Sequence, residues 1–466
     1  MSGRREGSCS ISAEERLAEF VRTARLEEIP LTAMEIVKNQ VLAIAGTTIA
    51  GATADGCEAA VRFYRELGGK PEATILIHGG KVPAQDAAFV NAVMGRALDF
   101  CDSMAPGPHP GAAIFPAALA ASELMGGCSG RAFITAVAVG TEVATRLNLS
   151  EAAYDGFDPT GICVPFGATA AASRILGLNL KQTWDALALA FNNCGGSFQS
   201  HVDGSLGVRF VQGRVAQSAL LAVRLAREGI TGPKNFLDGV YGYFHLYAKD
   251  MLTGETATSE LGTRYDLTKL VFKKYPSCAL TGGSTDVMLK LMAEEKITAE
   301  DVEQIEITVP PYTHKLVGHG FRIGENPKVN AQFSIQYCVA NALIRGASKL
   351  IHFEDEYIRD PRIMELTKRI NVIQEKSLEA RGHSALDMSV VSRSGREYRR
   401  SLDIAPGFPG NILTKKEHEQ RFWDCIDFAG DRMSRQNGEK IAALIDAIDT
   451  LDDIRRLIPL FASGRP

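Results

Sequence analysis

The chain has 466 residues, 45% of them hydrophobic, and carries a formal net charge of −4 at pH 7. This length predicts two or three domains with substantial cores, and the absence of any lysine- and arginine-rich tract argues against nucleic acid as a partner. The charged N-terminus and the lack of an apolar run of about 18 residues predict neither a signal peptide nor a membrane span.

The nine cysteines are scattered singly along the chain. No two of them form a C-x-x-C pair, and their spacing matches no zinc site. We therefore expect reduced thiols, no bound metal and a cytoplasmic location, because free thiols persist in a reducing compartment.

The first part of the chain reads as a succession of helices. Ser12, followed three residues later by Glu15, is typical of a helix capping box and predicts a first helix that begins near residue 13. An amphipathic helix is expected at 57–67, and alanine-rich helices at about 111–125 and 130–148. Since alanine and glycine let helix backbones approach closely, the pattern favours a helical bundle.

The stretch 97–116, ALDFCDSMAPGPHPGAAIFP, breaks this pattern and holds a dense set of reactive side chains. They are Asp99, Asp102, Ser103 and His109. Three prolines, at 106, 108 and 110, prevent a continuous helix, and an apolar helix follows at once. Helix N-termini favour anions, so a carboxylate substrate suits this loop. Alternatively, the aspartates are helix caps and His109 is a hydrogen-bonded loop residue.

Further polar loops recur on the helical scaffold. A short β-like run that ends in glycines brings His78 to a turn, the segment 154–167 carries Tyr154 and Asp158, and a later loop carries His201 and Arg209. Loops of this kind carry function more often than the helices that hold them. The structural alternative is that Asp158 is an N-cap and that the histidines only satisfy hydrogen bonds.

From about residue 265 the signals alternate between strand and helix. Strand-like runs occur at 301–310, 371–376, 384–395 and 396–404, and helical runs at 333–344 and 357–370. The last part, 414–461, returns to helix. We therefore expect a mostly α protein in which a large helical domain contains 1–267 and the return segment 405–466, and a smaller α+β lid domain contains 268–404.

Several segments together resemble the MmgE/PrpD family, which includes 2-methylcitrate dehydratase, cis-aconitate decarboxylase and iminodisuccinate epimerase. They are ALDFCDS…HPGAAIFPAALAASE, GTEVATRL…GFDPTG…FGATAAASRILGL, FKKYPSCALTGG, AQFSIQYCVANAL and PGFPGNILT. The resemblance implies a helical domain, an α+β lid, a cleft between them and a homodimer. It also implies chemistry without a cofactor on small polycarboxylates.

The resemblance can be followed residue by residue. Asp99, Ser103 and His109 stand where the family pattern has Asp, Thr or Ser, and His. At three other positions the expected His, Lys and His fall on Asp158, Val208 and Gly282, and Arg209 lies beside the second of them.

These departures bear on the expected reaction. A dehydratase must protonate a leaving hydroxyl and a decarboxylase a developing carbanion, so the loss of two histidines and a lysine removes candidate acids. We therefore expect a cofactor-independent epimerase that exchanges a proton at the α-carbon of an amino-linked dicarboxylate such as iminodisuccinate. The alternatives are a dehydratase or decarboxylase with a rearranged set of residues and, third, a binding protein that has lost its chemistry.

Inversion at carbon needs a base on one face and an acid on the other, and a cationic environment for the enolate-like charge. We expect His109, helped by Asp99, on one face and Lys273 or Tyr154 on the other. The expected catalytic residues are thus Asp99, Ser103, His109, Tyr154 and Lys273, and the expected substrate-binding residues are His78, Asp158, Arg209 and Lys274. The structural alternatives are that Lys273 and Lys274 form a solvated strand end and that Tyr154 only packs.

Overall fold

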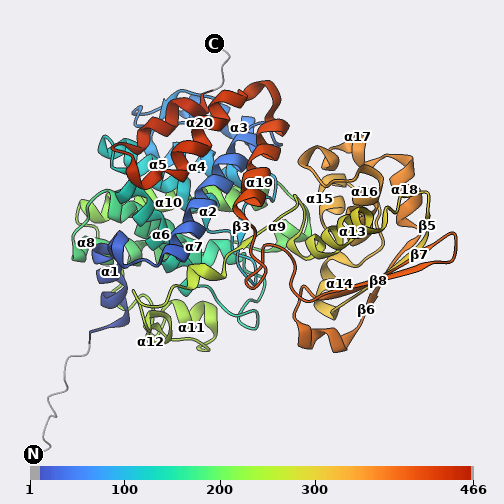
Figure 1. Ribbon diagram of the computed structural model, residues 1–466. Coiled ribbons are helices and arrows are strands. Elements are labelled where there is room, and N and C mark those ends of the chain that lie inside the picture. Colours follow the sequence, from blue (N-terminus) through green and yellow to red (C-terminus); the bar gives the residue numbers. More distant parts are fainter. Residues whose placement is uncertain (1–10, 463–466) are drawn as a thin grey trace, which may run out of the picture.

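A computed structural model describes residues 11–462 of the chain. The protein is mostly helical, as predicted, and its elements gather into a large helical body and a smaller body that carries a sheet (Figure 1). Among the described residues, no helix is long and apolar enough to cross a membrane. The cysteines from Cys57 onward are free thiols, and Cys9 lies outside the described residues.

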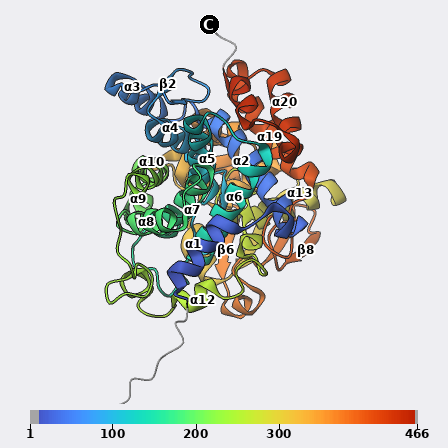
Figure 2. The same cartoon turned by 90° about the vertical axis from the view of Figure 1, so that its left-hand side faces the viewer.

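The large body contains fourteen of the described helices. They are α1 (Ala13–Thr23), α2 (Leu31–Gly51), α3 (Cys57–Leu67), α4 (Ala84–Arg96), α5 (Gly111–Met125), α6 (Gly130–Arg146), α7 (Pro159–Ile175), α8 (Leu180–Phe191), α9 (Gln199–Val202), α10 (Gly207–Arg227), α11 (Tyr243–Ala248), α12 (Gly254–Thr258), α19 (Lys415–Ala429) and α20 (Arg435–Asp446). Figure 2 shows that the C-terminal α19 and α20 lie on the side of the body that α2 occupies.

The first helix begins where its cap residue predicts. The Ser12 side chain accepts the N–H of Glu15 at 3.1 Å, and α1 starts at the next residue, Ala13. Leu17, Phe20 and Val21 are buried on one face of this helix. The predicted start near residue 13 is therefore confirmed, and its cause is local.

Small residues set the distance between the central helices. Where α6 crosses α7, a Cβ added to Gly140 would meet the carbonyl oxygen of Gly167 at 2.6 Å, and a Cβ on Gly167 would collide with the carbonyl of Gly140. The two backbones are thus in direct contact. The prediction that alanine and glycine allow close helix packing is confirmed at this crossing.

The smaller body is built on a four-stranded sheet in the order β6-β5-β7-β8. Its strands are β5 (Val302–Val309), β6 (Ile370–Gln374), β7 (Leu386–Ser392) and β8 (Glu397–Leu402), and its helices are α13 (Gly282–Glu295), α14 (Pro311–Val317), α15 (Pro327–Gln332), α16 (Ile335–Arg345), α17 (Asp355–Ile358) and α18 (Pro361–Thr367). Strand β5 pairs parallel with β6 and antiparallel with β7, which pairs antiparallel with β8.

One prediction in this body is wrong. The run 357–370 was expected to be a single helix, but α17 ends at Ile358, α18 begins only at Pro361, and Ile370 already belongs to β6. Proline cannot continue a helix from the residues before it, and Asp360 caps the second helix instead through the N–H of Arg362 at 3.0 Å.

Apolar side chains form one main core in each body. The larger core contains residues from 13 to 267 and from 422 to 461, and the smaller one contains residues from 287 to 390. The C-terminal helices therefore pack on helices from the N-terminal part of the chain, although the smaller body lies between the two parts in sequence. The domain boundaries at 268 and 405 stay predictions.

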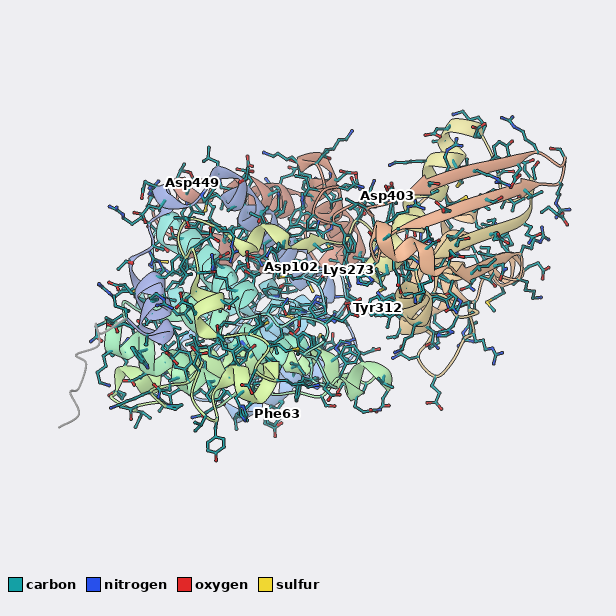
Figure 3. All side chains as sticks on the ribbon, turned by 90° about the horizontal axis from the view of Figure 1, so that it is seen from below. Phe63, Asp102, Lys273, Tyr312, Asp403 and Asp449 are labelled. Carbon is teal, nitrogen blue, oxygen red and sulfur yellow. The ribbon has the colours of Figure 1, made fainter. Side chains whose placement is uncertain are left out.

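Two further pairs of short antiparallel strands belong to the connections. Strand β1 (Ala73–Thr74) pairs with β2 (Lys81–Val82), and β3 (Asp102–Ser103) pairs with β4 (Val271–Phe272). The second pair joins the loop after α4 to the segment that leads into the smaller body. In Figure 3 the labelled Asp102 and Lys273 lie beside each other near the boundary between the two bodies.

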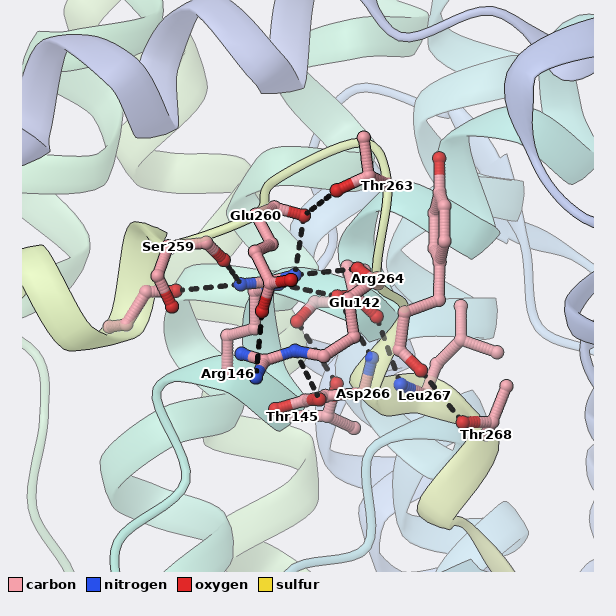
Figure 4. A network of polar contacts seen from close by, with 12 residues as sticks. Glu142, Thr145, Arg146, Ser259, Glu260, Thr263, Arg264, Asp266, Leu267 and Thr268 are labelled. Atoms are coloured by element: carbon pink, nitrogen blue, oxygen red, sulfur yellow. Dashed lines mark hydrogen bonds and ion pairs between the residues drawn. The ribbon is translucent and has the colours of Figure 1, made fainter.

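A buried ion pair on α6 fixes the chain that leads to β4 (Figure 4). Arg146 Nε lies 2.5 Å from Glu142 Oε1, and both side chains are almost fully buried. Arg146 also donates to four backbone carbonyls, those of Ala257, Ser259, Glu260 and Arg264. Glu142 accepts the N–H groups of Asp266 and Leu267 at 3.0 and 2.9 Å. The segment 257–267 is thus held against α6 by its main chain.

Candidate active site

The loop between α4 and α5 is irregular, as its prolines predict. Helix α4 ends at Arg96, and α5 begins at Gly111. Between them Asp99 has a φ of +52°, in the left-handed region that non-glycine residues rarely adopt. Such strained positions cluster at functional sites, where the surrounding structure holds them in place.

Asp99 is the centre of a buried ion cluster. Its Oδ1 lies 2.7 Å from Arg96 Nη1 and its Oδ2 lies 2.6 Å from Lys273 Nζ, which also donates to the Asp99 carbonyl at 2.8 Å. Burial by itself would raise the pKa of Asp99, but the charges of Lys273 and Arg96 hold that pKa well below its usual range. Lys273 is only 6% exposed, so it is not a solvated strand end.

His109 is held as a neutral imidazole. Its Nδ1 lies 2.7 Å from the Asp102 carbonyl oxygen, which can only accept, so Nδ1 carries the proton and Nε2 the free electron pair. Burial and the nearby charges of Arg96 and Lys273 lower the pKa of His109 well below its ordinary value. The ring can therefore act as a base at neutral pH.

The backbone of His109 is fixed from two other helices. Its N–H donates to Thr160 Oγ1 of α7 at 3.2 Å, and its carbonyl accepts from Gln212 Nε2 of α10 at 3.0 Å. Gln212 and Thr160 are themselves buried. These contacts and the ring contact to Asp102 leave His109 little freedom to reorient.

Asp102 caps α5. Its Oδ2 accepts the N–H of Gly111 at 3.0 Å and the Nε2 of Gln40 at 2.8 Å, and burial raises the pKa of this carboxyl. The start of α5, where the sequence favours a bound anion, thus already holds a carboxylate of the protein. The capping alternative holds for Asp102, whereas the side chain of Asp99 pairs with two cations.

Strand pairing brings Ser103 to the same place. Ser103 is opposite Val271 and Asp102 is opposite Phe272, so Lys273 follows directly after the paired residues. Ser103 is 9% exposed. The structure therefore gathers four of the five expected catalytic residues around one loop: Asp99, Ser103, His109 and Lys273.

Asp158 and Arg209 lie next to this cluster. Asp158 caps α7 through the N–H of Thr160 at 2.9 Å, and its Oδ2 lies 3.3 Å from His201 Nε2. Arg209 donates to the Asp55 carbonyl at 2.5 Å, and burial together with the repulsion of Arg96 lowers its pKa. The cationic side chains around the loop outnumber the carboxylates, which leaves a surplus of positive charge that suits an anionic substrate. The cations are Arg96, Arg209, Lys273 and Arg421, and the carboxylates are Asp99, Asp102 and Asp158.

The remaining expected site residues are engaged outside the ion cluster. His78 Nε2 lies 2.9 Å from the Ala52 carbonyl at the end of α2. Lys274 pairs with Asp286 at 2.7 Å and with Glu417 at 2.9 Å. Their expected roles in substrate binding stay predictions that these contacts do not favour.

Tyr154 supports the loop between α4 and α5 through a second residue. Its hydroxyl donates to Asn148 Oδ1 at 2.8 Å, and Asn148 donates to the carbonyl of Ala105 at 2.7 Å. Burial raises the pKa of Tyr154 well above its ordinary value, so an ionised tyrosine is unfavourable here. Lys273 is accordingly the better partner for His109.

Two family models together match most of the chain. Residues 15–254 match the model of the MmgE/PrpD N-terminal domain, and residues 275–447 match that of the MmgE/PrpD C-terminal domain. The chain belongs to the MmgE/PrpD family.

Curated relatives of the chain are named for two different enzyme activities. Cis-aconitate decarboxylase of Mus musculus is 25% identical over 387 residues, which cover 80% of this chain and 77% of that protein. The decarboxylase of Homo sapiens is 25% identical over 399 residues, 83% of this chain and 81% of that protein. The mitochondrial 2-methylcitrate dehydratase of Yarrowia lipolytica is 24% identical over 339 residues, 67% of this chain and 64% of that protein.

The three positions where this chain departs from the MmgE/PrpD pattern have distinct surroundings. Asp158 is the cap of α7, Val208 lies in the first turn of α10, and Gly282 is the first residue of α13. A Cβ added to Gly282 would meet nothing within 4 Å. Among residues 11–462, no group of three or more histidine, cysteine, aspartate or glutamate side chains is arranged to hold a metal ion.

Sequence reasoning missed several residues of the site. Arg96 could have been found, because it lies three residues before Asp99 at the end of a helix and such pairs often meet. Thr160 lies in the same polar segment as Asp158, whereas Gln212 and Arg421 reach the cluster from distant helices and carry no local signal. Arg421 donates from Nε to the Lys273 carbonyl at 2.6 Å.

Proposed function

We propose that this chain is a lyase that acts on a small polycarboxylate. The observation that carries the proposal is the neutral His109 beside the Lys273 ammonium, within a cluster that has a surplus of positive charge. The relatives named as a decarboxylase and a dehydratase support the same class of reaction.

The geometry favours elimination of water over loss of carbon dioxide. In an elimination, His109 Nε2 takes the proton from the carbon next to a carboxylate, the C–O bond on the neighbouring carbon breaks, and Lys273 protonates the leaving hydroxyl. A carbon–carbon double bond and water result. Decarboxylation breaks a C–C bond and needs an acid but no base, so a neutral imidazole is better suited to the first reaction.

The cationic side chains have a separate task. Arg96 uses Nη1 for Asp99, and its other donors make no hydrogen bond with the described residues. An arginine with free N–H groups is suited to a substrate carboxylate, because its planar fork matches two oxygens. Arg96 and Arg209 are therefore the proposed carboxylate ligands.

Epimerisation is the second candidate, and one observation favours it. Asp158, Val208 and Gly282 replace the His, Lys and His of the family pattern, which removes candidate acids for a leaving group. Inversion at the α-carbon of an amino-linked dicarboxylate such as iminodisuccinate needs only a base and an acid on opposite faces. His109 and Lys273 are the proposed pair in this case as well.

Proton NMR in deuterated buffer separates the two reactions. The enzyme is incubated with 2-methylcitrate, with cis-aconitate and with a mixture of iminodisuccinate stereoisomers, without added metal or nucleotide. A product of 2-methylcitrate whose methyl doublet has become a downfield singlet on a double bond, or carbon dioxide released from cis-aconitate, supports the lyase. Loss of the α-proton signal of iminodisuccinate with interconversion of isomers and no vinyl signal supports the epimerase. No change with any of the three contradicts both.

The expected homodimer and the cytoplasmic location stay predictions. Light scattering of the purified chain measures the first directly, and a mass near 50 kDa, that of one chain, would contradict it.

A further inference from the structure

Arg421 is a buried cation whose hydrogen bonds go to backbone oxygens. It lies in α19 and is 4% exposed, and among residues 11–462 no carboxylate lies within ion-pair distance of it. Its Nε donates to the Lys273 carbonyl at 2.6 Å and its Nη2 to the Phe100 carbonyl at 2.8 Å. The guanidinium lies over the ring of Phe100, 4.7 Å from the centroid, and faces Phe272 at 5.8 Å.

This placement is costly for the fold. A charge removed from water without an opposite charge is destabilising, and Nη1 of Arg421 has no hydrogen-bond partner. Burial lowers the pKa of Arg421 to about 10. An apolar side chain of similar size would fill the same space without this penalty, so stability alone does not account for an arginine here.

The two carbonyls that Arg421 binds are those just beyond the end of a strand pair. The β3–β4 ladder opposes Ser103 to Val271 and Asp102 to Phe272, and one further step would oppose Cys101 to Lys273. No ladder continues there. At this point the Arg421 guanidinium replaces the ladder hydrogen bonds, because it reaches both segments and donates to a carbonyl of each.

The same two segments also contact each other through a side chain, next to the two hydrogen bonds of Arg421. Phe100 directly follows Asp99, and the Lys273 ammonium contacts both the carboxylate and the carbonyl of Asp99. The segments therefore touch at their backbones through Arg421 and at their side chains through the Lys273–Asp99 ion pair. If the first contact is lost, the second loses the main-chain anchor of the lysine.

We infer that Arg421 is a positioning residue, which holds the main chain of Lys273 against that of Phe100 and so keeps the Lys273 ammonium on Asp99 beside His109. This inference rests on the proposed function only for the catalytic role of Lys273. The placement of Lys273 by Arg421 is a claim about geometry and can be tested without a substrate.

The substitutions are Arg421→Lys, which keeps the charge but replaces the rigid fork that spans the two carbonyls with a single ammonium, and Arg421→Gln, which removes the burden of a buried charge in case the first variant fails to fold. The chain offers a matched control. Arg174 of α7 is also a partly buried arginine that donates to two backbone carbonyls, those of Val21 and Ala24, and burial likewise lowers its pKa. Arg174→Lys therefore reproduces the same loss of donors far from the site.

The first readout is kinetic, on the substrate that the native enzyme turns over. A misplacement of a catalytic group by about 1 Å can cost about a hundredfold in rate, so we expect kcat of the Arg421 variants to fall by about that factor with KM nearly unchanged. The acidic limb of the pH profile of kcat should shift as well, since the Lys273 charge then no longer lowers the pKa values of Asp99 and His109. Arg174→Lys should leave kcat, KM and the pH profile unchanged. Native kcat and an unshifted profile in the Arg421 variants would overturn the inference.

The second readout needs no turnover and separates this inference from the proposed function. In a crystal structure of the Arg421 variant, we expect Lys273 Nζ to have left hydrogen-bond distance of the Asp99 carboxylate. If that contact persists at its native distance, Arg421 does not position Lys273, whatever reaction the enzyme catalyses. If the contact is lost while the native enzyme acts on none of the three substrates, the inference stands and the proposed function fails.

Discussion

Lys273 Nζ lies 2.6 Å from Asp99 Oδ2 although 174 residues separate the two in sequence. The contact joins the loop after α4 to the segment that leads into the smaller body. Both side chains are largely removed from water, so loss of Asp99 would leave the Lys273 ammonium buried without its anion, whereas loss of Lys273 would leave Asp99 with Arg96 alone.

Lys273→Met should abolish turnover while the protein stays folded. The variant removes the proposed acid and leaves Asp99 with Arg96 as its remaining partner, so we expect a rate loss of about 10² to 10⁴. Steady-state kinetics measures this loss. Lys274→Met is the matched control, because Lys274 pairs with Asp286 and Glu417 instead of the cluster. Equal losses in both variants would argue that the junction as a whole is disturbed, and a fully active Lys273→Met would exclude Lys273 from the reaction.

His109→Gln should remove proton exchange and also change the acid sensitivity of the fold. The pKa of His109 is depressed in the folded protein, so below about pH 6.5 the unfolded state binds the proton more readily and stability falls as pH falls. The variant lacks the contribution of His109 to the pH dependence of the unfolding free energy. Its midpoint of urea unfolding should therefore depend less on pH between about 6.5 and 5. His245→Gln is the control, since His245 is exposed and pairs with Asp250. Identical pH dependence in native protein and His109→Gln would contradict a buried neutral imidazole.

Asp99→Asn tests the charge of the cluster at constant shape. Asparagine tolerates the left-handed conformation that Asp99 adopts, so the loop should keep its path while Arg96 and Lys273 lose their shared anion. We expect lower activity, and a smaller loss of stability at acidic pH than in the native protein. The sign follows from the depressed pKa of Asp99: its ionised form stabilises the fold above the unfolded pKa of about 3.9, and this contribution is lost as pH falls below that value. Thermal unfolding at about pH 3 and at pH 7 measures the difference, and an unchanged pH dependence would count against the ion pair.

Gly140→Ala should destabilise the helical body without a direct effect on the chemistry. The added methyl would meet the carbonyl of Gly167 and force α6 and α7 apart, which in packed interiors costs about 1–3 kcal/mol. Gly282→Ala is the control, because its Cβ would enter open space at the start of α13. Chemical denaturation of both variants gives the comparison. A Gly140→Ala variant as stable as the native protein would mean that the two helices can separate freely.

Much of the fold could be predicted from sequence because its causes are local. The Ser12 cap, the proline-broken loop around His109 and the strand-like run 301–310, which forms β5, act within a few residues, and each predicted feature is present. The single helix expected across Pro361 was wrong. The apolar residues on both sides of the proline indicate a helix, but the chain divides into two helices there.

The site was predictable only where one loop carries it. Asp99, Ser103 and His109 are close in sequence, and Lys273 was expected only as a cation that could act on the opposite face of the substrate. The contacts that give these residues their charge states depend on tertiary structure: Gln212 reaches His109 from α10, and Arg421 reaches Lys273 from α19. No spacing rule links residues that lie more than a hundred positions apart.

The β3–β4 pair has a consequence for how substrate enters. The pair holds the segment that leads into the smaller body against the loop between α4 and α5. The Glu142–Arg146 ion pair of α6 immobilises the chain just before that segment. Any swing of the smaller body must therefore pivot close to Lys273, and groups at a pivot travel least. The reacting centre can stay assembled while the rest of the smaller body moves aside for the substrate.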